Sequence, residues 1–138
     1  MTNLAHAVEI AEQAHAGQTD KAGEPYVEHL ERVAAGVDSL DEKIVAYLHD
    51  VLEKGDGWTR ERLEQSGFSP RIVSAVVALT RESGEDEDHF VQRAAANDLA
   101  RPVKRADLED NRRQAVRSGK PTERYDSELA LLDGEQRD

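Results

Sequence analysis

The sequence of 138 residues contains no cysteine, and aromatic residues make up only 4% of it. The absence of cysteine excludes a disulfide scaffold and any zinc–thiolate site. No run approaches the roughly 20 apolar residues that are needed to cross a bilayer. The first turns carry His6, Glu9, Glu12 and His15 instead of the apolar run of a secretory signal. We therefore expect a cytoplasmic protein with no membrane partner.

Basic residues are also few, because 18 lysines and arginines face 29 aspartates and glutamates and give a formal net charge of −11. Proteins that bind nucleic acids usually present a basic face, so no DNA or RNA partner is expected. A small phosphorylated nucleotide is still compatible with this composition. Divalent cations and a local group of basic side chains hold phosphates despite an acidic exterior. The sequence leaves the oligomeric state open.

Apolar residues recur at helical spacing along most of the chain, and no segment shows a convincing period of two. We therefore expect an all-α bundle that forms a single domain over residues 1–138. Start signals support several of the helices, among them a capping box at Ser39 and Glu42 and the Ser69-Pro70 pair. The expected helices cover residues 3–17, 26–37, 40–54, 60–65, 70–79, 90–97, 102–117 and 122–132. Residues 18–24 and 82–88 are expected to form loops.

The dipeptide His49-Asp50, with His29 before it and Asp107 after it, is the most informative feature of the chain. Imidazole and carboxylate groups from three separate segments are the ligands that a divalent cation needs. Adjacent residues on a helix point about 100° apart, so His49 and Asp50 share an ion only if it lies between them. Other segments must then complete the site. Mixed His/Asp ligands suit Mn²⁺, Fe²⁺, Co²⁺ or Zn²⁺ better than Ca²⁺.

The ordered set His…His-Asp…Asp resembles the HD-domain metal phosphohydrolases. The surrounding residues narrow the resemblance to the RelA/SpoT-type branch, which includes the small alarmone hydrolases. Residues 14–18 and 21–29 are similar to its A-H-x-G-Q and K-x-G-x-P-Y-x-x-H patterns, and residues 47–53 to its L-L-H-D-x-x-E-D. Residues 103–111 are similar to its V-K-L-A-D-x-x-x-N. The matches span about residues 14–113 and imply an HD-type helical bundle that binds Mn²⁺.

The resemblance also implies a role for particular side chains. The implied metal ligands are His29, His49, Asp50 and Asp107. The implied contacts to a phosphorylated nucleotide are Lys21, Asn111 and Arg113. Three further basic residues, Lys104, Arg105 and Arg112, form either a group that faces phosphates or an ordinary solvated helix face.

Glu53 is the expected catalytic residue. It lies four residues after His49 and three after Asp50, so on a continuous helix it projects from the same face. A carboxylate at that position can orient an attacking water and accept its proton. The alternative interpretation is an ordinary exposed glutamate on a helix.

Two positions depart from the alarmone hydrolases. Lys54 stands where that branch has an acid that is one of its proposed catalytic groups. Asp20 stands where it has an arginine that helps to hold the nucleotide, and a carboxylate cannot stack on a purine as a guanidinium does. Two hypotheses follow. The first is a phosphohydrolase that acts on a phosphorylated nucleotide, with guanosine 3′,5′-bis(diphosphate) 3′-pyrophosphohydrolase as one form. The second is a catalytically weakened metal-binding or nucleotide-sensing HD module.

Overall fold

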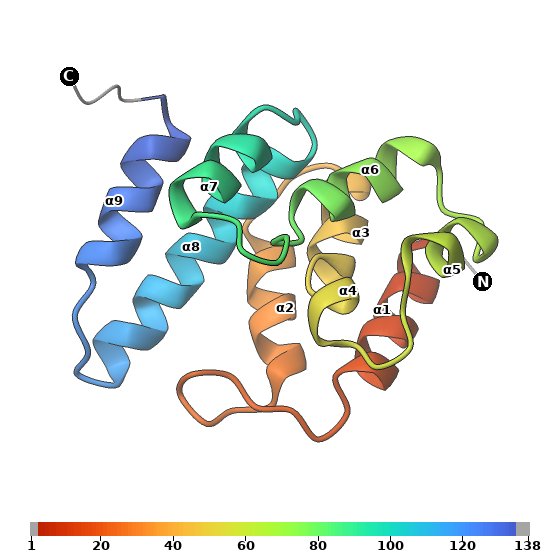
Figure 1. Ribbon diagram of the computed structural model, residues 1–138. Helices are drawn as coiled ribbons and strands as arrows, with labels where there is room; N and C mark the ends of the chain where they lie inside the picture. Colours follow the sequence, from red (N-terminus) through yellow and green to blue (C-terminus); the bar gives the residue numbers. More distant parts are fainter. Residues whose placement is uncertain (1–2, 135–138) are drawn as a thin grey trace.

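A computed structural model describes residues 3–134, and within this range the chain forms nine helices and no strand (Figure 1). The helices are α1 (Asn3–Ala14), α2 (Tyr26–Ala35), α3 (Leu40–Leu48), α4 (Val51–Lys54), α5 (Arg60–Gln65), α6 (Pro70–Ala78), α7 (Glu87–Ala95), α8 (Ala100–Arg117) and α9 (Glu123–Leu132). The expected all-α class is therefore confirmed. Over residues 3–134, none of these helices has both the length and the apolar character to cross a bilayer.

The helices pack around one main apolar core. Helices α1, α2, α6 and α8 surround α3, whose residues Ile44, Val45 and Leu48 are almost fully buried. Burial of each such side chain contributes about 1.5–3 kcal/mol. A smaller cluster that includes Val91, Leu108 and Leu132 joins α9 to α7 and α8. Figure 1 shows the consequence for the centre of the molecule, where α2, the α3–α4 junction and α8 lie close together.

The start signals in the sequence are confirmed. The hydroxyl of Ser39 accepts from the amide of Glu42 at 3.1 Å, and the carboxylate of Glu42 accepts from the amide of Ser39 at 2.7 Å. Thr59 and Ser69 cap α5 and α6 by accepting backbone amides. These contacts satisfy amides that have no partner within the helix, which is why such residues favour helix starts.

The expected continuous helix over residues 40–54 is wrong, because α3 ends at Leu48 and α4 begins at Val51. The Nδ1–H of His49 donates to the carbonyl of Ala46 at 2.6 Å. In a continuous helix that carbonyl receives the amide of Asp50. Asp50 instead adopts φ −107° and ψ 2°, and the chain turns at the two residues that were expected to bind metal.

Several other helix boundaries also differ from the expected ones. Helices α1 and α2 end earlier, at Ala14 and Ala35, while α7 and α8 begin earlier, at Glu87 and Ala100. Residues 86–88 are acidic, and acidic side chains in a first turn are stabilised by the helix dipole. The side chain of Asn97 accepts the amide of Ala100 at 2.9 Å and so supports the early start of α8.

The end of α1 lies directly against the end of α4. The side-chain amide of Gln18 donates to the carbonyl of Lys54 at 2.9 Å, while its oxygen accepts from Nδ1 of the buried His15 at 2.8 Å. A side chain at Gly55 would bring a Cβ within 2.9 Å of Ala14 Cβ and 2.6 Å of the Val51 carbonyl oxygen. Only glycine allows this approach without a shift of the backbone. The motif that contains His15 and Gln18 therefore fixes the turn that carries residues 53 and 54.

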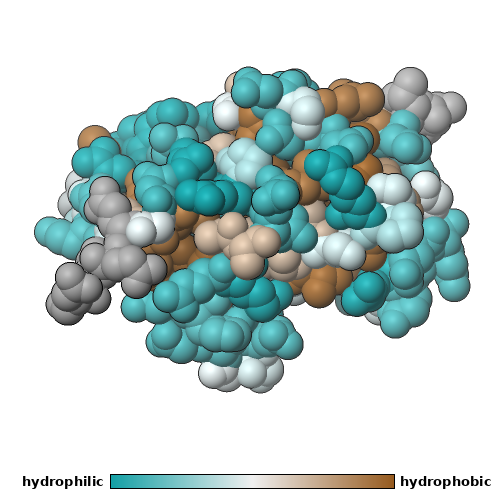
Figure 2. All heavy atoms as spheres, turned by 90° about the horizontal axis from the view of Figure 1, so that it is seen from above, coloured by the Kyte–Doolittle hydropathy of each residue, from teal (hydrophilic) through white to brown (hydrophobic). Residues whose placement is uncertain are grey.

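The surface agrees with the charged composition. Figure 2 shows one face of the molecule, on which hydrophilic residues predominate and apolar residues appear in smaller areas between them. Isolated apolar residues are normal on a protein surface.

Candidate metal centre

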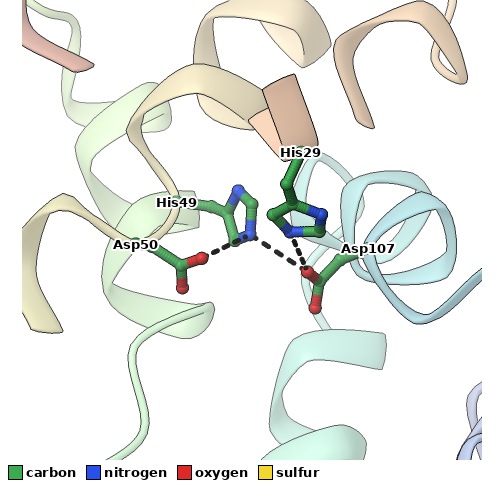
Figure 3. Close-up of side chains that lie close together, drawn as sticks. All are labelled: His29, His49, Asp50 and Asp107. Atoms are coloured by element: carbon green, nitrogen blue, oxygen red, sulfur yellow. Dashed lines mark hydrogen bonds and ion pairs between the residues drawn. The ribbon is translucent and has the colours of Figure 1, made fainter. Parts of the chain in front are cut away.

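The four expected metal ligands meet in the interior of the bundle. His29 comes from α2, His49 and Asp50 from the turn between α3 and α4, and Asp107 from α8. All four are buried, and one ligand atom from each lies within 4.8 Å of the others. Figure 3 shows the side chains pointing toward one another from the three segments.

The closest contacts in this group join imidazole nitrogens to carboxylate oxygens. Nε2 of His29 lies 3.0 Å from Oδ1 of Asp107, and Nε2 of His49 lies 3.3 Å from the same oxygen (Figure 3). Nε2 of His49 also lies 3.1 Å from Oδ2 of Asp50. Both histidines therefore present the same nitrogen to the centre of the group.

The other nitrogen of each ring is already engaged with an acceptor. Nδ1 of His29 lies 2.6 Å from Oδ2 of Asp110, and Nδ1 of His49 lies 2.6 Å from the carbonyl of Ala46. Because both partners accept only, each Nδ1 carries the hydrogen of a neutral ring. Each Nε2 then turns a lone pair toward carboxylate oxygens. Acceptors that face one another in this way require a positive charge between them, so the four residues fit a divalent cation.

A second layer of side chains holds the ligands in place. Asp110 accepts from His29, from Nε of Arg32 at 2.7 Å and from the amide of Gln114 at 2.7 Å. The hydroxyl of Tyr26 donates to Oδ2 of Asp50. A carboxylate behind a metal-binding histidine fixes its tautomer and orientation. Sequence reasoning missed Asp110, Arg32 and Gln114, although Asp110 and Gln114 lie one and two turns after Asp107 on a helix, where they share its face.

The electrostatics of the group follow from burial and from these contacts. Burial disfavours a charged imidazole, yet the neighbouring carboxylates outweigh it and raise the pKa of His29 and of His49 above the ordinary value. Burial also opposes ionisation of Asp107, but when His29 and His49 are protonated their Nε2–H groups donate to it and hold its pKa well below the ordinary value. A proton or a metal cation meets the same demand for positive charge, so the two compete.

The four residues of the His/Asp group line a pocket of about 330 Å³. Although the chain is acidic overall, the wall of this pocket also contains five basic residues, which are Lys21, Lys54, Arg81, Lys104 and Arg124. Lys104 is almost buried, with Nζ 3.5 Å from Oδ2 of Asp107 and 4.4 Å from the centre of the Phe90 ring. The pocket therefore combines the metal ligands with positive charge.

Glu53 and Lys54 share this pocket with the metal ligands. Both are exposed residues of the short helix α4, and Nζ of Lys54 lies 4.9 Å from the centre of the Tyr26 ring. Because the helix breaks between Leu48 and Val51, Glu53 does not lie on the same helix as His49. Its position in the pocket is set by the short helix α4. Asp56, another acid near this turn, is not among the residues that line the pocket.

The three expected nucleotide contacts are only partly brought together. Lys21 and Asn111 both line the pocket, and Nζ of Lys21 donates to Oδ1 of Asn111 at 3.2 Å. Arg113 does not line it. Its side chain is 61% exposed and pairs with Asp110 at 3.1 Å. In this structure Arg113 pairs with the second layer and lies outside the pocket.

The basic residues Lys104, Arg105 and Arg112 do not form one group in the structure. Lys104 faces the pocket, whereas Arg105 pairs with Asp133 and Arg112 pairs with Asp126. Arg81 and Arg124 complete the basic wall from the α6–α7 segment and from α9. Nothing in the sequence indicated these two residues, because they join the pocket only through the packing of distant segments.

Asp20 has a structural role. Its Oδ1 accepts the amides of Ala22 at 2.9 Å and Glu24 at 3.0 Å, and its Oδ2 accepts from Arg32 at 3.0 Å. The side chain is only 2% exposed. An arginine at this position would place a second cation beside Arg32 and remove the turn contacts, so it would open the loop before it held a base.

The fold and the site define a helical domain in which two histidines and two aspartates converge and could hold a metal ion. A model of the HD domain family matches residues 7–118, and the chain belongs to this family. Among solved structures, the chain is similar to one described as "A metazoan ortholog of SpoT hydrolyzes ppGpp and plays a role in starvation responses". The TM-score is 0.74 at 24% identity, over 98% of this chain and 84% of that chain. No curated protein matches the chain.

These comparisons confirm the expected family and the expected HD-type fold. At 24% identity the structural likeness concerns the fold. Family membership and the His/Asp group together support a metal-dependent phosphohydrolase as the class of enzyme.

The first prediction concerns metal content. If the four ligands converge on one ion, purified protein loaded with Mn²⁺ retains about one equivalent, and His49→Ala retains almost none. Added Mn²⁺ raises the melting temperature of the native chain, because a ligand that binds only the folded state stabilises it. Elemental analysis and thermal unfolding measure both effects. His89→Ala, which removes an exposed histidine outside the group, is the matched control and keeps the metal. A native chain without metal or thermal shift would contradict the assignment.

The second prediction concerns pH. His29 and His49 bind metal only when Nε2 is unprotonated, and the pKa of each lies above the ordinary 6.5 in the metal-free protein. Metal affinity is therefore fully present above these raised values and is lost as the pH falls through them. The Kd for Mn²⁺ should rise by about tenfold per pH unit for each proton displaced. Calorimetric titrations at several pH values test this, and an affinity that does not change would contradict it.

Proposed function

We propose that this chain is a metal-dependent phosphohydrolase that acts on a small phosphorylated nucleotide. The observation that carries the proposal is the pocket itself, in which a buried His/Asp group shares one cavity with lysines and arginines. A metal cation and basic side chains can together hold phosphate oxygens. This chain has a net charge of −11, yet several of its basic residues line this one pocket.

His29, His49, Asp50 and Asp107 are the residues that would hold the cation, and Mn²⁺ is the proposed ion. When bound, such an ion supplies Lewis-acid polarisation of a phosphoryl oxygen and lowers the pKa of water. The chain's own residues do the rest. Tyr26 and Asp110 keep Asp50 and His29 oriented.

Glu53 is the proposed general base. It is exposed within the pocket that contains the metal ligands, so its carboxylate can accept the proton of the water that attacks phosphorus. The bond from phosphorus to the leaving oxygen breaks as the bond to water forms. Lys104, next to Asp107, and Lys54, next to Glu53, offset the negative charge that accumulates on the phosphoryl oxygens.

The proposed nucleotide contacts are Lys21 and Asn111, which form a connected pair on the pocket wall. The amide of Asn111 can both donate and accept hydrogen bonds, as recognition of a base or a ribose requires. Guanosine tetraphosphate is one proposed substrate, since the structurally similar SpoT ortholog is described as hydrolysing ppGpp. Hydrolysis would then release pyrophosphate from the ribose 3′ position, in the cytoplasm and without a nucleic-acid partner.

A second candidate is a nucleotide-sensing module with weakened catalysis. The observation that favours it is Lys54, which places an ammonium against Tyr26 in the same pocket as Glu53, where the resemblance implies a second acid. In that case metal and nucleotide still bind, while proton transfer is slow. Turnover measured with metal-loaded protein against a panel of phosphorylated nucleotides separates the two candidates.

The third prediction tests Glu53. Glu53→Gln is nearly isosteric and removes the ionisable group. Metal content should stay near that of the native chain, while turnover falls by about 10²-fold or more, which is the usual scale for the loss of a general base. Glu61→Gln, on the exposed first turn of α5, is the matched control and should change neither quantity. Full activity of the Glu53 variant would show that another group handles the proton.

The fourth prediction tests Lys54. The native chain should hydrolyse guanosine tetraphosphate slowly or not at all, and Lys54→Asp should raise this turnover by restoring an acid beside Glu53. Lys54→Ala is the matched control, because it removes the cation without adding an acid, and it should not produce the gain. Rapid turnover by the native chain would contradict this prediction. Failure of Lys54→Asp to gain activity, when another phosphorylated nucleotide is hydrolysed, would favour that nucleotide as substrate.

A further inference from the structure

The loop between α1 and α2 is closed upon itself. A single backbone bridge joins Thr19 to Pro25, the amide of Asp20 donates to the carbonyl of Glu24 at 2.7 Å, and the amide of Tyr26 donates to the carbonyl of Gln18 at 2.9 Å. Residues 20 and 21 lie inside this closed segment, which passes at the bottom of the bundle in Figure 1. These backbone contacts hold the residues of the loop in fixed positions relative to one another.

The first connection from this loop to the metal ligands is ionic. Oδ2 of Asp20 accepts from Arg32 at 3.0 Å, and Arg32 reaches both oxygens of Asp110, at 2.7 Å and 3.2 Å. Asp110 in turn accepts from Nδ1 of the metal ligand His29 at 2.6 Å. The side chains of Asp20, Asp110 and His29 are each only 2% exposed and that of Arg32 is 27% exposed, so most of this connection is shielded from solvent.

Two further connections start at Lys21. Its backbone amide donates to Oε1 of Gln114 at 3.0 Å, and the amide of Gln114 donates to Oδ2 of Asp110 at 2.7 Å. Its ammonium donates to Oδ1 of Asn111 at 3.2 Å, and the amide of Asn111 donates to Oδ1 of the ligand Asp107 at 3.4 Å. Two adjacent loop residues are thus connected to His29 and Asp107 by three routes, two of which meet at Asp110.

We propose that Asp20, Arg32 and Gln114 are positioning residues that couple the loop bearing Lys21 to the metal centre. Metal binding fixes His29 and Asp107, these ligands fix Asp110 and Asn111, and the loop is held through them. Coupling between two sites is reciprocal, so the ordered loop tightens metal binding by the same factor. The role of Lys21 as a nucleotide contact rests on the proposed function, whereas the coupling itself needs no nucleotide.

This coupling gives a physical reason for the aspartate at position 20. The resemblance implies an arginine there that helps to hold a nucleotide, but in this chain the side chain at this position is almost fully buried and pairs with Arg32. Lys21 is then the proposed nucleotide contact of this loop, and Asp20 determines where Lys21 stands.

The test separates the two tasks of Asp20. Asp20→Asn keeps an oxygen for the amides of Ala22 and Glu24, but removes the charge opposite Arg32. Asp41→Asn, which breaks the exposed pair with Arg71, is the matched control. Calorimetry gives the Kd for Mn²⁺, and hydrogen–deuterium exchange gives the protection of residues 20–24 with and without Mn²⁺. Melting temperatures of the metal-free proteins report on folding.

In the native chain, Mn²⁺ should slow exchange in residues 20–24. Asp20→Asn should weaken Mn²⁺ binding by about 3- to 10-fold. This is at or below the lower end of what is usual for side chains that contact a metal ligand directly, because Asp20 acts through Arg32 and Asp110. It should also remove most of the metal-dependent protection, while Asp41→Asn changes neither. If Asp20→Asn does not fold, Arg32→Lys, which leaves the turn contacts of Asp20 intact, should give the same two changes.

Native Mn²⁺ affinity in a folded Asp20→Asn or Arg32→Lys variant would overturn the coupling. The coupling would also be overturned if Mn²⁺ did not alter the hydrogen–deuterium exchange of residues 20–24 in the native chain, or if the native chain bound no Mn²⁺. Neither the Kd for Mn²⁺ nor the hydrogen–deuterium exchange requires a nucleotide. If both show the coupling but no phosphorylated nucleotide is hydrolysed, the coupling stands and only the proposed hydrolase function is overturned.

Discussion

The structure depends on the close approach of acceptor groups in its interior. Two carboxylates and two imidazole nitrogens converge within 4.8 Å, and all four residues are buried, so water compensates their charge only in part. An unpaired buried charge costs several kcal/mol, so the arrangement stands only with a cation or protons at its centre. The residues around it serve this requirement. Asp110 orients His29, Tyr26 orients Asp50, and Lys104 lies beside Asp107.

The same constraint explains the irregular point of the fold. A continuous helix through residues 40–54 would direct His49 and Asp50 about 100° apart. The break, which the ring of His49 makes at the carbonyl of Ala46, turns Asp50 out of the helical direction and brings both side chains to one centre. Gln18 and Gly55 then fix the short helix that follows, with Glu53 and Lys54 at the edge of the pocket.

Much of the fold could be predicted from the sequence, because helix starts have local causes. The capping box at Ser39 and Glu42 satisfies its own amides and needs no tertiary context. The convergence of His29, His49, Asp50 and Asp107 could also be predicted, since the order of their residue types is distinctive. The helix break could not, because it depends on one side chain competing for one carbonyl. Arg81 and Arg124 could not either, since only the packing of α7 and α9 brings them to the pocket.

The two departures from the alarmone hydrolases prove to be of different kinds. The side chain of Asp20 is almost fully buried, accepts amides of its own loop and pairs with Arg32, so its charge is compensated within the protein even though the residue borders the pocket. Lys54 is exposed to the pocket, and its ammonium lies against the ring of Tyr26, whose hydroxyl holds the ligand Asp50. A cation there attracts phosphate oxygens and cannot accept a proton. Of the two departures, Lys54 is therefore the one that bears directly on the chemistry of the site, and it leaves Glu53 as the acid on α4 that can move a proton in the pocket.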